Sequence, residues 1–228
     1  MSDMSSPVPG AVTVCAEPAG VGRRAAGEDP RKRDQILEGA KRVFMKAGFD
    51  AATMNDITRE AQVSKGTIYV YFNNKEDLFA ALIERERSRL VASMRSALSG
   101  DGSIEENLTS FGTALATHVL SPGTIYAMRT VIGVIERMPQ LANRFFTTGP
   151  DSVRSVIETY LASQVEAGHV ELDDVPLAAI QFMELSTAGL FKPRLFGKLD
   201  KAVPREEIDR TVASAVRMFL ATYGKQRG

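Results

Sequence analysis

The sequence predicts an all-α fold, in which a small N-terminal three-helix unit containing a helix-turn-helix precedes a larger C-terminal helical region. Apolar residues recur at intervals of three and four in one segment after another, which is the period of amphipathic helices. Residues that cap helix N-termini stand before most of these segments. No segment alternates apolar and polar residues as half-buried strands do.

Composition narrows the class of protein. The chain has 228 residues, a formal net charge of zero, 44% hydrophobic and 25% charged residues, which is typical of a globular protein. Its one cysteine, Cys15, cannot form an internal disulfide, which fits the reducing cytoplasm. No apolar run approaches the ~18 residues that a membrane span needs, and the N-terminus lacks a secretion pattern. We therefore expect a cytoplasmic protein with no membrane partner.

Residues 1–29 are rich in Ser, Pro, Ala, Gly and Val and show no helical or strand period, so we predict a disordered N-terminal extension. Arg23 and Arg24 lie near its end, just before Arg31, Lys32 and Arg33. These cations would either touch nucleic-acid phosphates as an arm or form a solvated charge cluster.

Residues 30–75 are predicted to form the three-helix unit. Its first helix spans residues 30–47, because apolar residues follow a helical period there and Gly48 suits the position after its end. Two short helices joined by a tight turn follow. Thr53 is placed to cap the first of them in a capping box with Asp56, and Ser64 to cap the second.

The second short helix begins with Lys65, Gly66 and Thr67, at the point where free backbone N–H groups and the helix dipole favour an anion. Gly66 allows close approach of a backbone or a base edge. Tyr69 and Tyr71 carry hydroxyls that could reach phosphate oxygens, although both could simply pack. Nine basic residues face five acidic ones between residues 31 and 75, a net charge of about +4, so the rest of this neutral chain is net acidic.

The order of residues in this segment resembles the DNA-binding signature of the TetR family of transcriptional regulators. The matching positions are Thr53, Ile57, Ala61, Val63, Ser64, Gly66, Tyr69, Tyr71, Phe72, Lys75 and Leu78. The resemblance implies that double-stranded DNA is the partner. We expect Lys65, Gly66 and Thr67 to meet base edges or offer backbone amides, and Thr53, Ser64, Tyr69, Tyr71 and Lys75 to hold phosphates.

Residues 76–228 are predicted to form a helical ligand-binding and dimerisation domain, entered through a connecting helix at residues 76–99. Nothing turn-like interrupts that helix before Gly100, so a shift at its far end would move the three-helix unit bodily. Ser103 with Glu106, and Ser121 with Pro122, open the next two helices. Further helices follow up to Gly168, from Pro176, and from residue 205, with a polar connection over residues 192–204.

This C-terminal region resembles the ligand domain of AefR-like regulators, in the run from Tyr126 to Phe146, in Gly149-Pro150 and in Asp173-Asp174. The resemblance implies an effector pocket between helices and a homodimer formed by the last two helices. Aromatic and flexible apolar residues are the candidates for the pocket, although each alone is more often a core residue: Phe111, Leu115, His118, Tyr126, Met128, Phe145, Tyr160, Phe182 and Met183.

No signature of an enzyme accompanies these features. The sequence has no nucleophile elbow, no Gly-rich phosphate loop and no His-Glu-x-x-His, and its two histidines cannot build a standard zinc site. Asp173-Asp174 is better explained as a helix cap than as a catalytic pair. We expect no cofactor, no metal and no catalytic residue.

The sequence therefore favours a homodimeric regulator, most simply a repressor, released from a palindromic operator by a small, largely apolar effector. Two alternatives stay open. A DNA-packaging protein would bind random DNA as well as a palindrome, and an enzyme with an appended DNA-binding head would turn over a small molecule.

Overall fold

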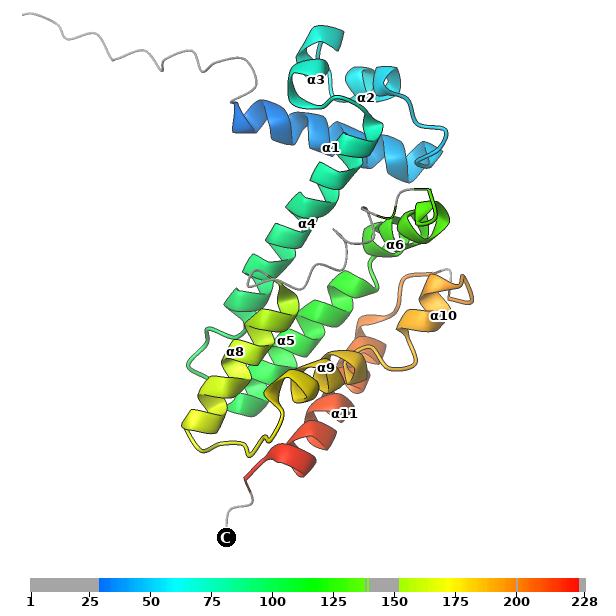
Figure 1. The fold of residues 1–228 in the computed structure, drawn as a ribbon. Helices are drawn as coiled ribbons and strands as arrows, with labels where there is room; N and C mark the ends of the chain where they lie inside the picture. Colours follow the sequence, from blue (N-terminus) through cyan, green and yellow to red (C-terminus); the bar gives the residue numbers. More distant parts are fainter. Residues whose placement is uncertain (1–28, 138, 140–151, 200, 226–228) are drawn as a thin grey trace, which may run out of the picture.

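The computed structural model describes residues 29–137, 139, 152–199 and 201–225, and these form an all-α fold, as the sequence predicts (Figure 1). Within the described residues the only strand-like pairing is a single antiparallel bridge between Val170 and Gly224. The helices are α1 (Pro30–Ala47), α2 (Met54–Glu60), α3 (Lys65–Tyr71), α4 (Lys75–Ala97), α5 (Ile104–Val119), α6 (Pro122–Val134), α8 (Val153–Glu166), α9 (Val175–Leu185), α10 (Phe191–Leu195) and α11 (Arg205–Tyr223).

Helices α1, α2 and α3 form the head at one end of the molecule (Figure 1). Their apolar faces meet in one cluster, in which Ile36, Leu37, Ile57 and Ile68 are fully buried. The turn between α2 and α3 is tight because Gln62 adopts a φ of 53°. Left-handed backbone is uncommon for a residue with a side chain, and here it forms part of the turn between the two helices.

The core of the head extends beyond residues 30–74, where we expected it to be self-contained. Phe79 and Leu82 of α4 belong to the same cluster, and so do Val131 and Val134 of α6. Ile132 and Ile135 lie on an apolar face of α6 that the helical period alone would bury, but their exposed fractions are 56% and 42%. The neighbouring valines are buried in their place, so α6 packs against the head.

The body has its own core between α4, α5, α8, α9 and α11. Helix α11 packs along α5, and α8 lies against both α9 and α4 (Figure 1). Phe111, Phe182 and Phe219 fill the centre of this core, with the rings of Phe182 and Phe219 edge to face and their centroids 5.3 Å apart. Such aromatic pairs stabilise the packing of helices beyond the contribution of the apolar area that they bury.

Residues 192–195, which we expected to belong to a polar connection, lie in the short helix α10. Its anchor is Arg194, which is 6% exposed and donates to the carbonyls of Leu120, Leu199 and Lys201. Arg129 of α6 in turn donates to the carbonyls of Arg194 and Leu195. A buried arginine needs such acceptors, and they fix α10 against α6. No helix in the described parts of the chain is both long and apolar enough to cross a membrane.

The closest approach in the head is between α1 and the end of α2. A Cβ atom added at Gly39 would lie 2.6 Å from the Cβ of Ala61 and 2.8 Å from its backbone. We expect Gly39→Ala to destabilise the protein by about 1–3 kcal/mol, because the backbone at Ala61 would have to move. Gly133→Ala is the control, since nothing lies within 4 Å of the added atom. Thermal unfolding of both variants tests this, and equal melting temperatures would contradict it.

Candidate nucleic-acid interface and internal cavity

The start of α2 is held by a reciprocal cap. The hydroxyl of Thr53 accepts from the backbone N–H of Asp56 at 3.2 Å, and the Asp56 carboxylate accepts from the Thr53 backbone N–H at 3.2 Å and from its hydroxyl at 2.6 Å. These hydrogen bonds, first of all the one from the Thr53 hydroxyl, lower the pKa of Asp56. The sequence predicted this capping box, and the structure contains it.

Helix α3 presents a polar first turn to solvent. Ser64 caps it by accepting from the Thr67 backbone N–H at 3.0 Å, and Ser64, Lys65 and Gly66 are exposed. A Cβ atom at Gly66 would meet nothing of this chain closer than the Ser64 hydroxyl at 3.8 Å. The packing of the fold therefore does not require glycine at this position, and glycine weakens a helix. The space that Gly66 leaves for an external backbone or base edge is a physical reason for its presence.

The remaining face of α3 divides into an exposed and a buried side. Tyr69 and Val70 are 46% and 50% exposed, whereas Ile68 is fully buried in the head. Tyr71 is half-buried and packs against the same cluster. Of the two tyrosines, Tyr69 is thus the freer to reach a phosphate.

The structure gives Lys75 a role inside the protein. Its ammonium donates to the carbonyls of Phe49, Asp50 and Ala52 at 2.9, 2.9 and 3.3 Å, and it lies 4.9 Å from the centre of the Phe49 ring. An ammonium has three protons, and all three have acceptors here. We therefore assign Lys75 to holding the α1–α2 connection and no longer to a phosphate.

A cavity of about 520 Å³ lies where the head meets the body. Four of the predicted pocket residues line it, namely His118, Tyr126, Met128 and Met183. Phe111, Leu115 and Phe182 instead fill the body core, Tyr160 packs against that core, and Phe145 lies outside the described residues. The prediction therefore placed pocket residues too deep in the body.

The other half of the lining comes from the head and the connecting helix. The cavity is lined by Lys41, Phe44 and Met45 of α1 and by Phe79, Leu82, Ile83, Glu86, Arg87 and Leu90 of α4. These residues were not predicted, because we expected the pocket only among residues after position 100. Charged residues beside apolar ones on α1 and α4, such as Lys41 near Phe44 and Glu86 near Ile83, are the signal that could have indicated a partly polar wall.

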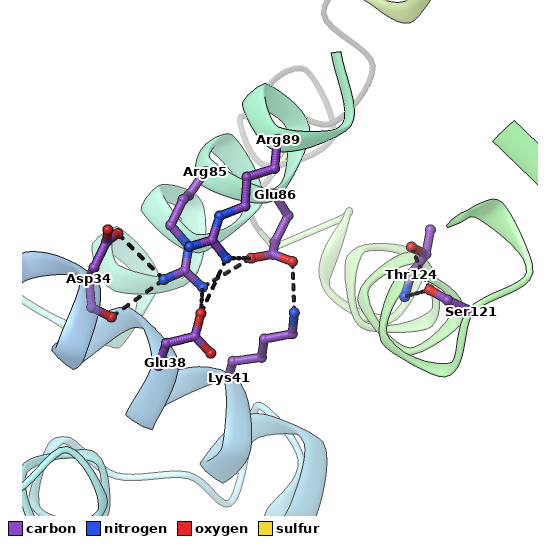
Figure 2. A network of polar contacts seen from close by, with 8 residues as sticks. All are labelled: Asp34, Glu38, Lys41, Arg85, Glu86, Arg89, Ser121 and Thr124. Atoms are coloured by element: carbon purple, nitrogen blue, oxygen red, sulfur yellow. Dashed lines mark hydrogen bonds and ion pairs between the residues drawn. The ribbon is translucent and has the colours of Figure 1, made fainter. Parts of the chain in front are cut away.

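A network of six charged residues joins α1 to α4 at the edge of this cavity (Figure 2). Lys41 pairs with Glu86 at 2.7 Å, and the Arg85 guanidinium lies 2.9 Å from Glu38 and 3.0 Å from Glu86. Asp34 and Arg89 complete the network at distances of 3.6 Å from Arg85 and 3.3 Å from Glu86. Three cations thus balance three carboxylates.

The pKa values of two cavity residues reflect this setting. Burial alone would raise the pKa of Glu86, but hydrogen bonds and charges from Lys41 and Arg85 outweigh it, and the pKa is lowered. Burial lowers the pKa of His118, with a smaller opposing effect from the Glu86 charge. Near neutral pH the carboxylate therefore stays ionised and the imidazole stays neutral.

Two protein families match parts of this chain. Residues 36–82 match the family described as "Bacterial regulatory proteins, tetR family", and residues 106–225 match the "AefR-like transcriptional repressor, C-terminal domain". The second match covers more than half of the chain. The chain belongs to the TetR family. It is a DNA-binding transcriptional regulator and not an enzyme.

Two curated relatives match about a third of this chain. The transcriptional activator FasR of Mycolicibacterium smegmatis is 40% identical over 83 residues, 36% of this chain and 37% of FasR. The repressor AcnR of Corynebacterium glutamicum is 37% identical over 82 residues, 36% of this chain and 42% of AcnR. The matched segments thus span well under two thirds of either relative.

Solved structures superpose on most of this chain. A TetR-family regulator from Mesorhizobium loti superposes with a TM-score of 0.79 at 24% identity, over 86% of this chain and 98% of that chain. The flavonoid-responsive regulator FrrA superposes with a TM-score of 0.66 at 27% identity, over 87% of this chain and all of FrrA.

The two lysines of the α3 region offer a matched test. We expect Lys65→Met to weaken DNA binding and to reduce the salt slope of the affinity, because one cation is removed from the turn of α3 that is expected to face DNA, without a change in melting temperature. Lys75→Met should instead lower the melting temperature, because three carbonyls lose their donor. Salt-dependent gel shifts and thermal unfolding measure both. A large loss of salt slope in Lys75→Met alone would reverse the assignment.

Proposed function

We propose that this TetR-family chain is a ligand-responsive repressor that a small, largely apolar effector releases from a palindromic operator in the cytoplasm. The observation that carries the proposal is the cavity between head and body, whose lining comes from both. An occupant of this cavity contacts Lys41 and Met45 of the head and, at the same time, His118 of α5 and Met183 of α9 in the body.

A ligand shifts a conformational equilibrium only through different affinities for the two states. A cavity lined by the body alone would change little when the head moves, so its occupant would have little effect on the position of the head. Here any change in the angle between α1 and the body alters the cavity itself, so states of different head position differ in ligand affinity. Helix α6 adds a second route, because Tyr126 lines the cavity while Val131 and Val134 pack in the head cluster.

Operator recognition by a palindrome requires two copies of the head related by two-fold symmetry. We assign the dimer contact to α9 and α11, the last two long helices. Leu177 and Ile180 of α9 are 49% and 38% exposed, and Met218 of α11 is 53% exposed. Apolar side chains on two helices that pack together in one chain fit burial against a second copy.

The direction of regulation rests on the body. The C-terminal region matches a family described as repressors, whereas the FasR and AcnR matches lie in shorter segments and include an activator and a repressor. We therefore favour repression. The similarity to FrrA, described as flavonoid-responsive, supports an effector of aromatic or apolar character.

Filling the cavity should separate effector response from DNA binding. Met128 lines the cavity, while Ile132, one turn further along α6, is 56% exposed. We expect Met128→Trp to bind operator DNA as the native chain does but to need at least about tenfold more effector for release, because overpacking a site costs ~1–3 kcal/mol. Ile132→Trp should respond normally. Gel shifts with a palindrome from the neighbouring promoter, titrated with an effector found by thermal-shift screening, provide the measurement. Equal responses of the two variants would argue against this cavity.

Charge placed on the dimer face should separate the two copies. We expect Met218→Asp to give monomers in light scattering, because a carboxylate would be buried without a partner. Phe196→Asp is the control, since Phe196 is 82% exposed but lies after α10, away from α9 and α11. A monomer produced by Phe196→Asp and not by Met218→Asp would place the interface elsewhere.

A further inference from the structure

The polar groups on the cavity wall restrict what the effector can be, if the chain is ligand-responsive as proposed above. Each cation on the described wall already has a carboxylate partner. Lys41 pairs with Glu86 at 2.7 Å, Arg87 with Glu84 at 2.6 Å, and Arg154 with Glu158 at 2.6 Å. An anionic effector would have to compete with one of these pairs.

A cationic effector meets the converse difficulty. The one wall carboxylate, Glu86, already receives Lys41 on one oxygen and both Arg85 and Arg89 on the other, at 2.7, 3.0 and 3.3 Å. A fourth cation would gain little there and would be repelled by the other three. The charged end of the cavity is therefore balanced, and it favours an uncharged guest over either ion.

Most other polar groups on the wall are already bonded. The Ser121 hydroxyl accepts from the Thr124 backbone N–H at 3.3 Å, and the Ser152 hydroxyl from the Ser155 backbone N–H at 3.1 Å, as helix caps. The Tyr126 hydroxyl has no partner among the described residues, but it is fully buried and so does not face the open cavity.

His118 differs from these groups. It lies on the last turn of α5, lines the cavity and is half-buried, and its imidazole ring makes no hydrogen bond or ion pair within the described residues. Its neutral ring has one donor and one acceptor nitrogen, and it feels the charges of both Glu86 and Lys41. A guest that bonds to His118 therefore places its polar end beside the ion pair that joins α1 to α4.

The rest of the wall is apolar and suits a flat ring. Met45, Met128 and Met183 supply flexible thioethers that pack well against aromatic groups, while Phe44 and Phe79 lie behind the wall and are each only 1% exposed. The volume of about 520 Å³ is within the range of drug-sized sites.

We propose that the effector is an uncharged hydroxylated aromatic molecule, whose hydroxyl group hydrogen-bonds to His118 next to the Lys41–Glu86 pair. His118 is then the residue that selects a hydroxyl over a hydrocarbon. The ion pair excludes charged analogues of the same shape.

Three probes with one ring system test this on the full chain at neutral pH: 2-naphthol, 2-naphthoate and 2-naphthylmethylammonium, with naphthalene as the hydrocarbon reference. Titration calorimetry should show 2-naphthol binding at least about tenfold more tightly than any of the other three, which is the effect of about one satisfied hydrogen bond in a dry site. Tighter binding of the carboxylate or the ammonium compound would overturn the proposal, and so would failure of all four to bind.

His118→Phe should reduce 2-naphthol affinity by about tenfold and leave naphthalene affinity unchanged, while His118→Gln should retain part of the preference for 2-naphthol. His169→Phe is the matched control, because His169 is exposed and bonded to Gln164, far from the cavity lining. An unchanged preference for 2-naphthol in His118→Phe would overturn the assignment to His118. Should His118→Phe fail to fold, His118→Gln and the ranking of the four probes on the native chain still decide.

Operator binding without ligand is measured separately by gel shift. A chain that binds 2-naphthol through His118 but never loses its operator would contradict the proposed function and leave the ligand class intact. A chain released from its operator by charged molecules only would do the opposite.

Discussion

The position of the head on the body depends on the contact between α1 and α4. Its apolar part is the edge-to-face pair of Phe44 and Phe79, with ring centroids 5.3 Å apart, and its polar part is the six-residue charge network. Isolated surface ion pairs contribute little, about 0–1 kcal/mol. The Arg85 side chain, however, is only 8% exposed and faces three carboxylates. Removing one of these partners would weaken the compensation of a nearly buried charge, so the network fixes orientation more than it adds stability.

Because Glu86 belongs both to this network and to the cavity wall, the orientation of the head and the binding of the proposed effector would be physically linked. Any guest that changes the surroundings of Glu86 changes the partner of Lys41 on α1. No long chain of intermediate residues is needed, since the two events share one side chain. The coupling free energy is then bounded by the strength of the contacts that a guest makes or breaks around this pair.

The sequence predicted the local features of the fold well, because they depend on residues close together in the chain. The caps at Thr53, Ser64 and Ser103 are present as predicted, and so is the uninterrupted helix α4. Features that depend on distant contacts were harder to predict. Lys75 matched a family pattern, but its carbonyl acceptors lie more than twenty residues earlier. The period of α6 allowed two apolar faces, and only the position of the head decides between Val131 and Ile132.

The expectation that a shift along α4 alone moves the head therefore needs revision. A lone connecting helix would let the head swing with little resistance, because only one element would cross the boundary. Here Val131 and Val134 of α6 are 2% and 3% exposed within the head cluster, and Arg137 lies 3.4 Å from Asp50 after α1. Because both α4 and α6 connect the head to the body and line the cavity, a movement of the head changes the shape of the cavity. We propose that a guest that fits one shape acts on both links at once, and that it thereby controls the spacing of two heads in a dimer.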